Sequence, residues 1–139
     1  MMGNKFLSFA ALSGFISVAF GAFVSHGLQY EFSEQQINWF DIAWKYHTFH
    51  TVALLALGWF ISATMPQNAP KCRQTAVNII GFSWLLGILL FSGPLYTMAV
   101  LGTCSIAMFV PVGGMAFLFG WATLLVVSVR SSFARRAMR

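Results

Sequence analysis

The chain has 139 residues, of which 58% are hydrophobic, 17% aromatic and only 8% charged, and its mean hydropathy is +0.75. Soluble domains are about 25% charged, and a small water-soluble domain cannot hide most of its apolar residues. This composition excludes a soluble globular domain, and it equally excludes intrinsic disorder. Two cysteines are too few for a disulfide scaffold. We therefore expect one integral membrane domain over residues 1–139.

The net charge of +5 does not predict a nucleic-acid partner. Four of the eight basic residues lie in the last ten positions, directly after an apolar stretch. Charges in this position orient a membrane protein, and the chain shows no basic face interleaved with aromatic residues. We expect membrane lipids as partners and no nucleic acid.

A membrane-spanning helix needs about 20 predominantly apolar residues, so the gaps between charged residues predict the spans. The cluster at 65–70, which contains two prolines, ends the second span. The charge-free stretch 74–129 is long enough for two spans, with a turn after Gly102. The sequence predicts an all-α membrane protein with four transmembrane helices in an antiparallel bundle. These spans cover about residues 6–28, 46–65, 76–101 and 106–129.

The positions of Lys and Arg predict the orientation of these helices. Seven of the eight basic residues lie at the amino terminus, in the 66–73 loop or in the carboxyl-terminal tail, whereas the 29–45 loop has only Lys45. The positive side of a membrane protein is cytoplasmic, so both termini are expected in the cytoplasm. Cys72 is then cytoplasmic, Cys104 lies on the opposite side, and the two are not expected to pair.

The first outer loop is predicted to have its own secondary structure. Ser33 and Gln36 have the spacing of a capping box, and apolar residues recur downstream at helical spacing. We expect a short amphipathic helix over about 34–45, which either lies at the membrane interface or extends the second span outward. Its aromatic residues are typical of an interfacial anchor without activity.

Small residues and prolines are expected to shape the packing of the helices, because lipid gives helices no hydrophobic reason to associate. Ser13 and Ser17 belong to a small-residue stripe on the first helix, with one member every fourth residue. Elsewhere, prolines and glycine pairs predict helix breaks or kinks that free backbone groups. The residues predicted to break helices or to allow close packing are Gly21, Gly93, Pro94, Pro111, Gly113, Gly114 and Gly120.

Polar residues inside the spans are the first place to look for function, because they are costly in lipid. At about 1.5 Å rise per residue, the in-span polar residues fall at a similar height in the outer leaflet. They form the candidate pocket, which consists of His26, His47, His50, Ser92 and Tyr96. One interpretation is that these side chains reach toward headgroups or hydrogen-bond between helices. The other is that they line a pocket for a small ligand or a quinone-like headgroup.

Other chemistry has less support. A metal site needs three or four ligands, and no carboxylate or cysteine lies at the level of the histidines, so no metal and no cofactor is expected. A haem would need two histidines on different helices, and the chain lacks a motif for covalent attachment. Ser92 is not in a nucleophile elbow, and no in-span carboxylate could orient a base. The sequence therefore does not predict an enzyme.

Four motifs resemble one family along most of the chain, roughly positions 6 to 130. They are Gly21-Ala22-Phe23 leading to His26-Gly27; Tyr46 with His50; Leu90-Phe91-Ser92-Gly93 with Tyr96; and Pro111-Val112-Gly113-Gly114 with Phe117 and Gly120-Trp121. With these motifs in this order, the chain resembles the YgdD-like small inner-membrane proteins, also called domain of unknown function 423. The resemblance implies a four-helix protein of the inner (plasma) membrane and supplies no catalytic or cofactor residue.

Two functions from different classes are compatible with these observations. The first is a non-enzymatic accessory or interaction module, which packs against other membrane proteins or forms a homo-oligomer. The alternative is binding or transport of a small ligand in an outer-leaflet pocket built from His26, His50, Ser92 and Tyr96.

Overall fold

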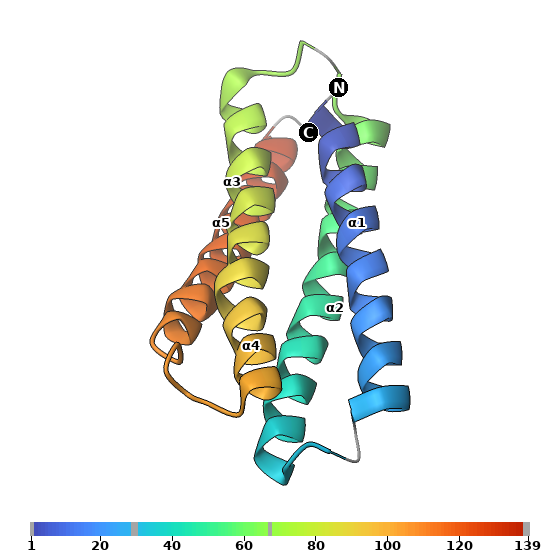
Figure 1. The fold of residues 1–139 in the computed structure, drawn as a ribbon. Helices are drawn as coiled ribbons and strands as arrows, with labels where there is room; N and C mark the ends of the chain where they lie inside the picture. The colour runs from blue at the N-terminus through green and yellow to red at the C-terminus, as the bar shows by residue number, and fades with distance from the viewer. Residues whose placement is uncertain (1, 29–30, 67, 138–139) are drawn as a thin grey trace.

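The computed structural model is all-helical and describes residues 2–28, 31–66 and 68–137. Two of its helices continue through a π-helical turn, so the chain forms four helical rods (Figure 1). Gln67, in the predicted cluster at 65–70, and Arg139, in the basic tail, lie outside the described residues. The elements are α1 (Met2–Phe23) with η1 (Val24–Leu28), α2 (Glu34–Thr64), α3 (Lys71–Gly87) with η2 (Ile88–Ser92) and α4 (Gly93–Leu101), and α5 (Phe109–Ala137).

The second rod is longer than predicted, because α2 begins at Glu34 and runs without interruption to Thr64. The expected separate amphipathic helix over 34–45 is therefore wrong, and the alternative of an outward extension of the second helix is right. The predicted capping box starts this helix: the Ser33 hydroxyl accepts from the Gln36 amide (3.3 Å), and Gln36 Oε1 accepts from the Ser33 amide (3.0 Å). No proline follows before Pro66, so nothing stops the helix earlier.

The third rod continues as a helix through Gly93-Pro94, where the sequence predicted a break or a kink, and its backbone is irregular just before these residues. Pro94 has no amide hydrogen, and the chain adjusts one turn earlier by forming η2. The Gly93 amide there donates to the Ile88 carbonyl, five residues back, as in a π-helix. Pro111 is the third residue of α5, where a helix needs no amide donor, so α5 also continues through its proline.

The rods are antiparallel, and the two chain ends lie at the same end of the molecule (Figure 1). In the middle of the arrangement, α2 packs against α1 on one side and against α3, η2 and α4 on the other. The last rod, α5, packs mainly against α3 and η2. As a result, α1 depends chiefly on α2 for its contacts and stands apart from α3 along much of its length (Figure 1).

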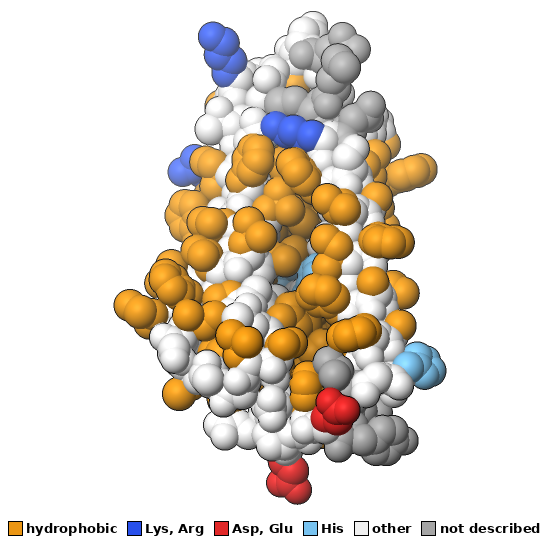
Figure 2. Space-filling view, viewed as in Figure 1, with side chains coloured by type: hydrophobic (Ala, Val, Ile, Leu, Met, Phe, Trp, Pro, Cys, Tyr) orange, Lys and Arg blue, Asp and Glu red, His pale blue; other side chains and the backbone are white. Residues whose placement is uncertain are grey.

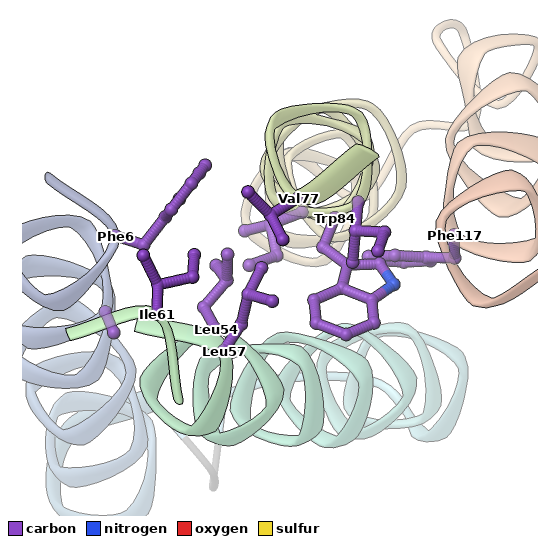
Figure 3. Packing of buried hydrophobic residues seen from close by; sticks show 10 residues of the cluster. Phe6, Leu54, Leu57, Ile61, Val77, Trp84 and Phe117 are labelled. Carbon is purple, nitrogen blue, oxygen red and sulfur yellow. The ribbon is translucent and has the colours of Figure 1, made fainter. Parts of the chain in front are cut away.

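The larger apolar core crosses the molecule from α1 to α5. Figure 3 shows it running from Phe6 on α1, over Leu54 on α2 and Trp84 on α3, to Phe117 on α5. Two of these rings lie directly over glycines of the neighbouring helix, because Phe6 packs on Gly81 and Phe117 on Gly87. A second cluster, around Tyr96 and residues of α2 and α4, lies nearer the other end.

The structure also shows how close the predicted packing residues lie to their neighbours. The backbone of Phe91 lies directly against Gly113, and the Trp84 ring lies 2.6 Å from the position of a β-carbon on Gly120. The Trp44 ring lies 3.1 Å from the position of a β-carbon on Gly21, whereas the Phe91 ring lies 3.8 Å from that position on Gly114, an ordinary contact distance. No atom comes within 4 Å of the corresponding position at Gly93.

Three rods are long and apolar enough to cross a membrane: Lys5–Gly27, Lys71–Leu101 and Phe109–Ser131. The fourth, α2, has 31 residues, about 46 Å at about 1.5 Å per residue, so it is long enough to span. It is less apolar than the others, because it carries charges near its start and polar residues such as His47, Thr48 and Thr51 in its middle.

The contact at Gly113 gives a test of this packing. Replacing Gly113 with Ala places a methyl group against the Phe91 backbone, which cannot rotate away, so we expect a loss of about 1–3 kcal/mol in the free energy of unfolding. Gly114→Ala is the matched control: its methyl group has space, and alanine is the better helix former by up to about 1 kcal/mol. Unfolding curves in detergent check both values. Equal effects at the two positions would contradict the contact.

Candidate functional site

The residues of the predicted pocket do not form one cluster. His47 and His50 are both buried, with 4% and 3% of their surface exposed, but they contact different helices. His26 is exposed on η1 and lines neither of the two cavities described below. The structure therefore brings His47, Ser92 and Tyr96 together, and it places His50 in a separate aromatic cluster.

His50 is fully engaged within the apolar core. Its Nδ1–H donates to the Tyr46 carbonyl (2.8 Å), and its Nε2 accepts from the Trp121 indole N–H (3.1 Å). Because a carbonyl only accepts and an indole only donates, His50 is the neutral tautomer with its proton on Nδ1. The ring also stacks on Phe117, with 3.6 Å between centroids. Both nitrogens and one ring face are occupied, so His50 joins α2 to α5 and is not free to bind a ligand.

His47 belongs to a chain of polar side chains that joins α1, α2 and α4. Its Nδ1 lies 3.2 Å from the Tyr96 hydroxyl, and its Nε2 lies 2.9 Å from the Ser13 hydroxyl. Ser13 is also hydrogen-bonded to Thr51 (2.5 Å). A neutral imidazole has one donor and one acceptor nitrogen, so this chain can run in either direction, depending on the tautomer.

A lateral cleft of about 680 Å³ lies between α1 and the rod formed by α3, η2 and α4. Figure 2 shows it as a hollow between two columns of apolar side chains, with a histidine side chain at its base. Its polar floor consists of Ser13, His47, Ser92 and Tyr96. Its apolar wall residues are Phe9, Leu12, Ile16, Phe20, Phe82, Leu85, Leu86, Ile88 and Leu89.

Aromatic contacts lie at both ends of the cleft. At one end the Phe6 ring packs edge-on against Phe82, 5.6 Å between centroids, and at the other Phe20 packs edge-on against Tyr96 at 5.0 Å. The cleft-lining residues of α1 run from Phe9 to Phe20, which is about 16 Å along the helix. The cleft is therefore open to the side but limited in length.

Among the polar residues of the cleft floor, Ser92 has a hydroxyl group without a hydrogen-bond partner in the described part of the chain. Its side chain is 1% exposed, and its hydroxyl has no hydrogen-bond partner among the described residues. Hydroxyls in a helix commonly donate to the carbonyl four residues back, as Thr97 does to Gly93 here (3.0 Å). The Ser92 hydroxyl makes no such bond to the Ile88 carbonyl, which lies in the π-helical turn and accepts the Gly93 amide. A residue that lines the cleft thus carries a buried hydroxyl without a partner among the described residues.

The indole N–H of Trp84 also has no partner, but its setting differs. Trp84 belongs to the apolar core, where its ring lies against Gly120, and it lines neither cavity. A ligand in the cleft could therefore satisfy Ser92 but not Trp84.

A second cavity of about 490 Å³ adjoins the first. Three residues line both cavities: Phe20, Gly93 and Tyr96. The space around Gly93 is open, as noted above, so this glycine keeps the floor clear between the two cavities.

Some cleft residues were not predicted as site residues from the sequence. Ser13 was noted only for helix packing. Nothing in the sequence separated the apolar residues of the cleft walls from other apolar residues of the spans. One signal was present: Ser13 and Ser17 on α1 match His47, Thr48 and Thr51 on α2, and two polar stripes of this kind suggest helices that hydrogen-bond to each other. Among the described residues, no three His, Cys, Asp or Glu side chains are grouped so that they could bind a metal ion.

Comparison with known proteins gives one family. The family described as "Protein of unknown function (DUF423)" matches residues 20–114. The chain is 40% identical to a UPF0382 membrane protein of Haemophilus influenzae over 130 residues, which cover 94% of this chain and 98% of the relative. It is 37% identical to the UPF0382 inner membrane protein YgdD of Escherichia coli K12 over 135 residues, 94% of this chain and 93% of the relative.

A more distant relative is the UPF0382 membrane protein SSP2132 of Staphylococcus saprophyticus, 34% identical over 123 residues, or 87% of this chain and 93% of the relative. No solved structure matches the chain. The resemblance seen in the four sequence motifs is confirmed, and so is the inner-membrane location. The chain belongs to the DUF423 (UPF0382) family of inner-membrane proteins.

Proposed function

We propose that this protein is a non-enzymatic, four-span membrane protein that binds a membrane-soluble ligand in the lateral cleft. The observation that carries the proposal is the Ser92 hydroxyl, which is buried at the cleft floor without a partner. Leaving a buried polar group unsatisfied costs about 1–3 kcal/mol, and a ligand with a hydrogen-bonding group would recover that cost. Of the two functions considered from the sequence, the cleft favours ligand binding over an interaction module.

The walls of the cleft support entry from the lipid phase. Leu12 and Leu89, which flank the opening on its two sides, are 59% and 68% exposed. In a membrane these side chains would contact lipid, so an apolar molecule could reach the cleft without passing through water. The volume lies within the range of small-molecule sites, about 300–1,000 Å³.

The length of the cleft argues against a partner helix as its occupant. A transmembrane helix must cross about 30 Å of hydrocarbon, whereas the linings of the two adjoining cavities together run from Phe9 to Val24 along the first rod, about 22 Å. A transmembrane helix would therefore extend beyond the Phe6–Phe82 contact at one end and, at the other, past the Phe20–Tyr96 contact and beyond the second cavity. A short ligand leaves both contacts intact.

The polar floor supports binding rather than catalysis. Ser13 and His47 are at the distance of a nucleophile and a base, but Tyr96 takes the position that a carboxylate occupies in a catalytic triad. A tyrosine hydroxyl can fix the tautomer, yet it supplies no negative charge to stabilise an imidazolium ion. Charging His47 inside an apolar bundle without a counter-ion would be costly.

The four-span topology with cytoplasmic termini is part of the proposal. As the central helix, α2 turns its polar residues toward its neighbours, which would allow it to span despite its lower hydropathy. The charges agree with this topology: basic residues lie near the end that carries both termini, and acidic residues lie at the other end (Figure 2). The positive-inside rule places the first end in the cytoplasm.

Two cysteines allow a direct test of the orientation. Cys72 in the first turn of α3 and Cys104 after α4 are both free and exposed, and they lie at opposite ends of the same rod. We expect a membrane-impermeant maleimide to label Cys104 in intact spheroplasts and to label Cys72 only after permeabilisation. The single-cysteine variants Cys72→Ser and Cys104→Ser identify which thiol reacts. Labelling of Cys72 in intact spheroplasts would overturn the orientation.

Gly93 allows a test of the cleft. Gly93→Leu adds a side chain into the open space at the floor without altering a helical backbone position, so the protein should fold and insert normally. We expect mild extraction of the wild-type protein to recover a co-purifying small molecule, detected by mass spectrometry of the extract. The variant should lose at least nine-tenths of it, a change of about 1.4 kcal/mol or more in binding.

Gly27→Leu is the matched control for this variant. Gly27 also has open space around it, but it lies on η1 and lines neither cavity, so this variant should retain the ligand. Equal retention in both variants, or no bound molecule in the wild-type protein, would contradict ligand binding in the cleft.

A further inference from the structure

We infer that the ligand of the cleft is an uncharged amphiphile that presents a carbonyl oxygen to Ser92 and Tyr96. This inference rests on the proposed ligand-binding function and adds the chemical class of the ligand. It depends on three features: the hydrogens that the floor can donate, the uncharged lining of the cleft, and the position of its apolar walls.

The floor can offer two donors to one acceptor. Ser92 and Tyr96 lie four residues apart on one rod, so their side chains are on the same face, and both line the cleft. The Ser92 hydroxyl has no partner to which it could donate. Its hydrogen is therefore used by no other described group, whichever way the hydrogen bonds of the floor run, and a ligand that reaches Ser92 could accept it.

The second hydrogen depends on the tautomer of His47. With its proton on Nδ1, His47 donates to the Tyr96 oxygen, while Ser13 donates to Nε2 and Thr51 donates to Ser13. The Tyr96 hydrogen is then free to point toward the ligand. A carbonyl oxygen has two lone pairs and can accept from Ser92 and Tyr96 together, so a carbonyl ligand selects this tautomer.

The charge of the lining excludes an ionised headgroup at the floor. No Lys, Arg, Asp or Glu is among the residues that line the cleft in the described part of the chain. Without such a partner, an ionised carboxylate or phosphate in this apolar site would have no counter-charge. The ligand must therefore be neutral at the end that reaches Ser92.

The apolar walls of the cleft determine the chemistry of the rest of the ligand. Phe9, Phe20 and Phe82 present aromatic side chains to the cleft, and the second cavity adjoins it beyond Phe20 and Tyr96. A ring or chain attached to the carbonyl would fill this apolar space. Both a membrane quinone and the ester group of a neutral glycerolipid have this chemistry.

The test uses four probes of similar apolar size: decyl-benzoquinone, methyl dodecanoate, decylbenzene, which lacks an acceptor, and dodecanoate, which is charged. Binding to the detergent-solubilised full-length protein is measured from the shift in unfolding temperature as probe concentration rises, because a ligand of the folded state stabilises it. We expect one or both carbonyl probes to bind at least tenfold more tightly than decylbenzene and dodecanoate. Whichever of the two carbonyl probes binds more tightly shows whether the natural ligand carries a quinone or an ester.

Ser92→Ala separates the hydrogen bond from the apolar contact. We expect this variant to bind the carbonyl probes about three- to tenfold more weakly, the loss of one hydrogen bond, and to bind decylbenzene unchanged. Tyr96→Phe, which keeps the ring, should weaken the carbonyl probes similarly. Ser105→Ala, in the exposed turn after α4, is the control and should leave all four affinities unchanged. Without probe, Ser92→Ala should unfold at a higher temperature than the wild type, because it removes an unsatisfied buried hydroxyl.

The two proposals fail in different ways. If Gly93→Leu blocks every probe but Ser92→Ala weakens carbonyl probes and decylbenzene equally, the cleft is the site and the carbonyl inference is overturned. Equal or tighter binding of dodecanoate overturns it as well, and so does a lower unfolding temperature of Ser92→Ala without probe. If no probe binds the wild-type protein, or if Gly93→Leu binds as the wild type does, the proposed function itself fails.

Discussion

The polar side chains in the middle of α2 must find their hydrogen-bond partners on the neighbouring helices, because the hydrocarbon of a membrane supplies none. Much of the arrangement follows from this constraint. His50 reaches Trp121 on α5, and His47 reaches Ser13 on α1 and Tyr96 on α4. With partners required on both sides, α2 occupies the centre of the arrangement, although it is the least apolar of the four rods. The hydrogen bonds specify which helices are neighbours, and the apolar contacts then bring those neighbours together.

The cleft arises because α1 packs mainly on α2, whereas α3 packs mainly on α5. Close contacts at glycines bring α3 and η2 together with α5, because the Phe117 ring lies over Gly87 and the Phe91 backbone lies against Gly113. Contacts of α1 are mostly with α2, through hydroxyl groups and through Leu7 against Gly58, and α1 meets α3 closely only near Phe6. The side of α1 that faces α3 is therefore left without a partner over the length of the cleft.

Sequence reasoning predicted the four helices, because gaps between charges, the prolines at 66 and 70 and a capping box mark most of their limits, although Pro94 and Pro111 lie inside helices. It also identified Gly113 and Gly120 as packing residues from their small size alone. It could not predict that His47 and His50, three residues apart, contact different helices, because a buried central helix has neighbours on several sides. The continuous helix at Pro94 was equally hidden, since a π-helical turn depends on how one turn of backbone relaxes. The cleft depends on the distance between two rods, and no local pattern encodes that distance.

These observations meet at Ser92. The proline two residues later has no amide donor, the Gly93 amide donates to the Ile88 carbonyl in the π-helical turn, and the buried Ser92 hydroxyl has no partner among the described residues. An alanine at this position would avoid the cost in a protein that had only to fold. The neighbouring Gly93 also lowers stability, because a larger residue could fill the open space and has a higher helix propensity than glycine. Two adjacent residues are thus less stabilising than simple alternatives, and both face the same cleft. Stability alone does not account for that coincidence, whereas a ligand with an acceptor group and an apolar body would use both the free hydroxyl and the free space.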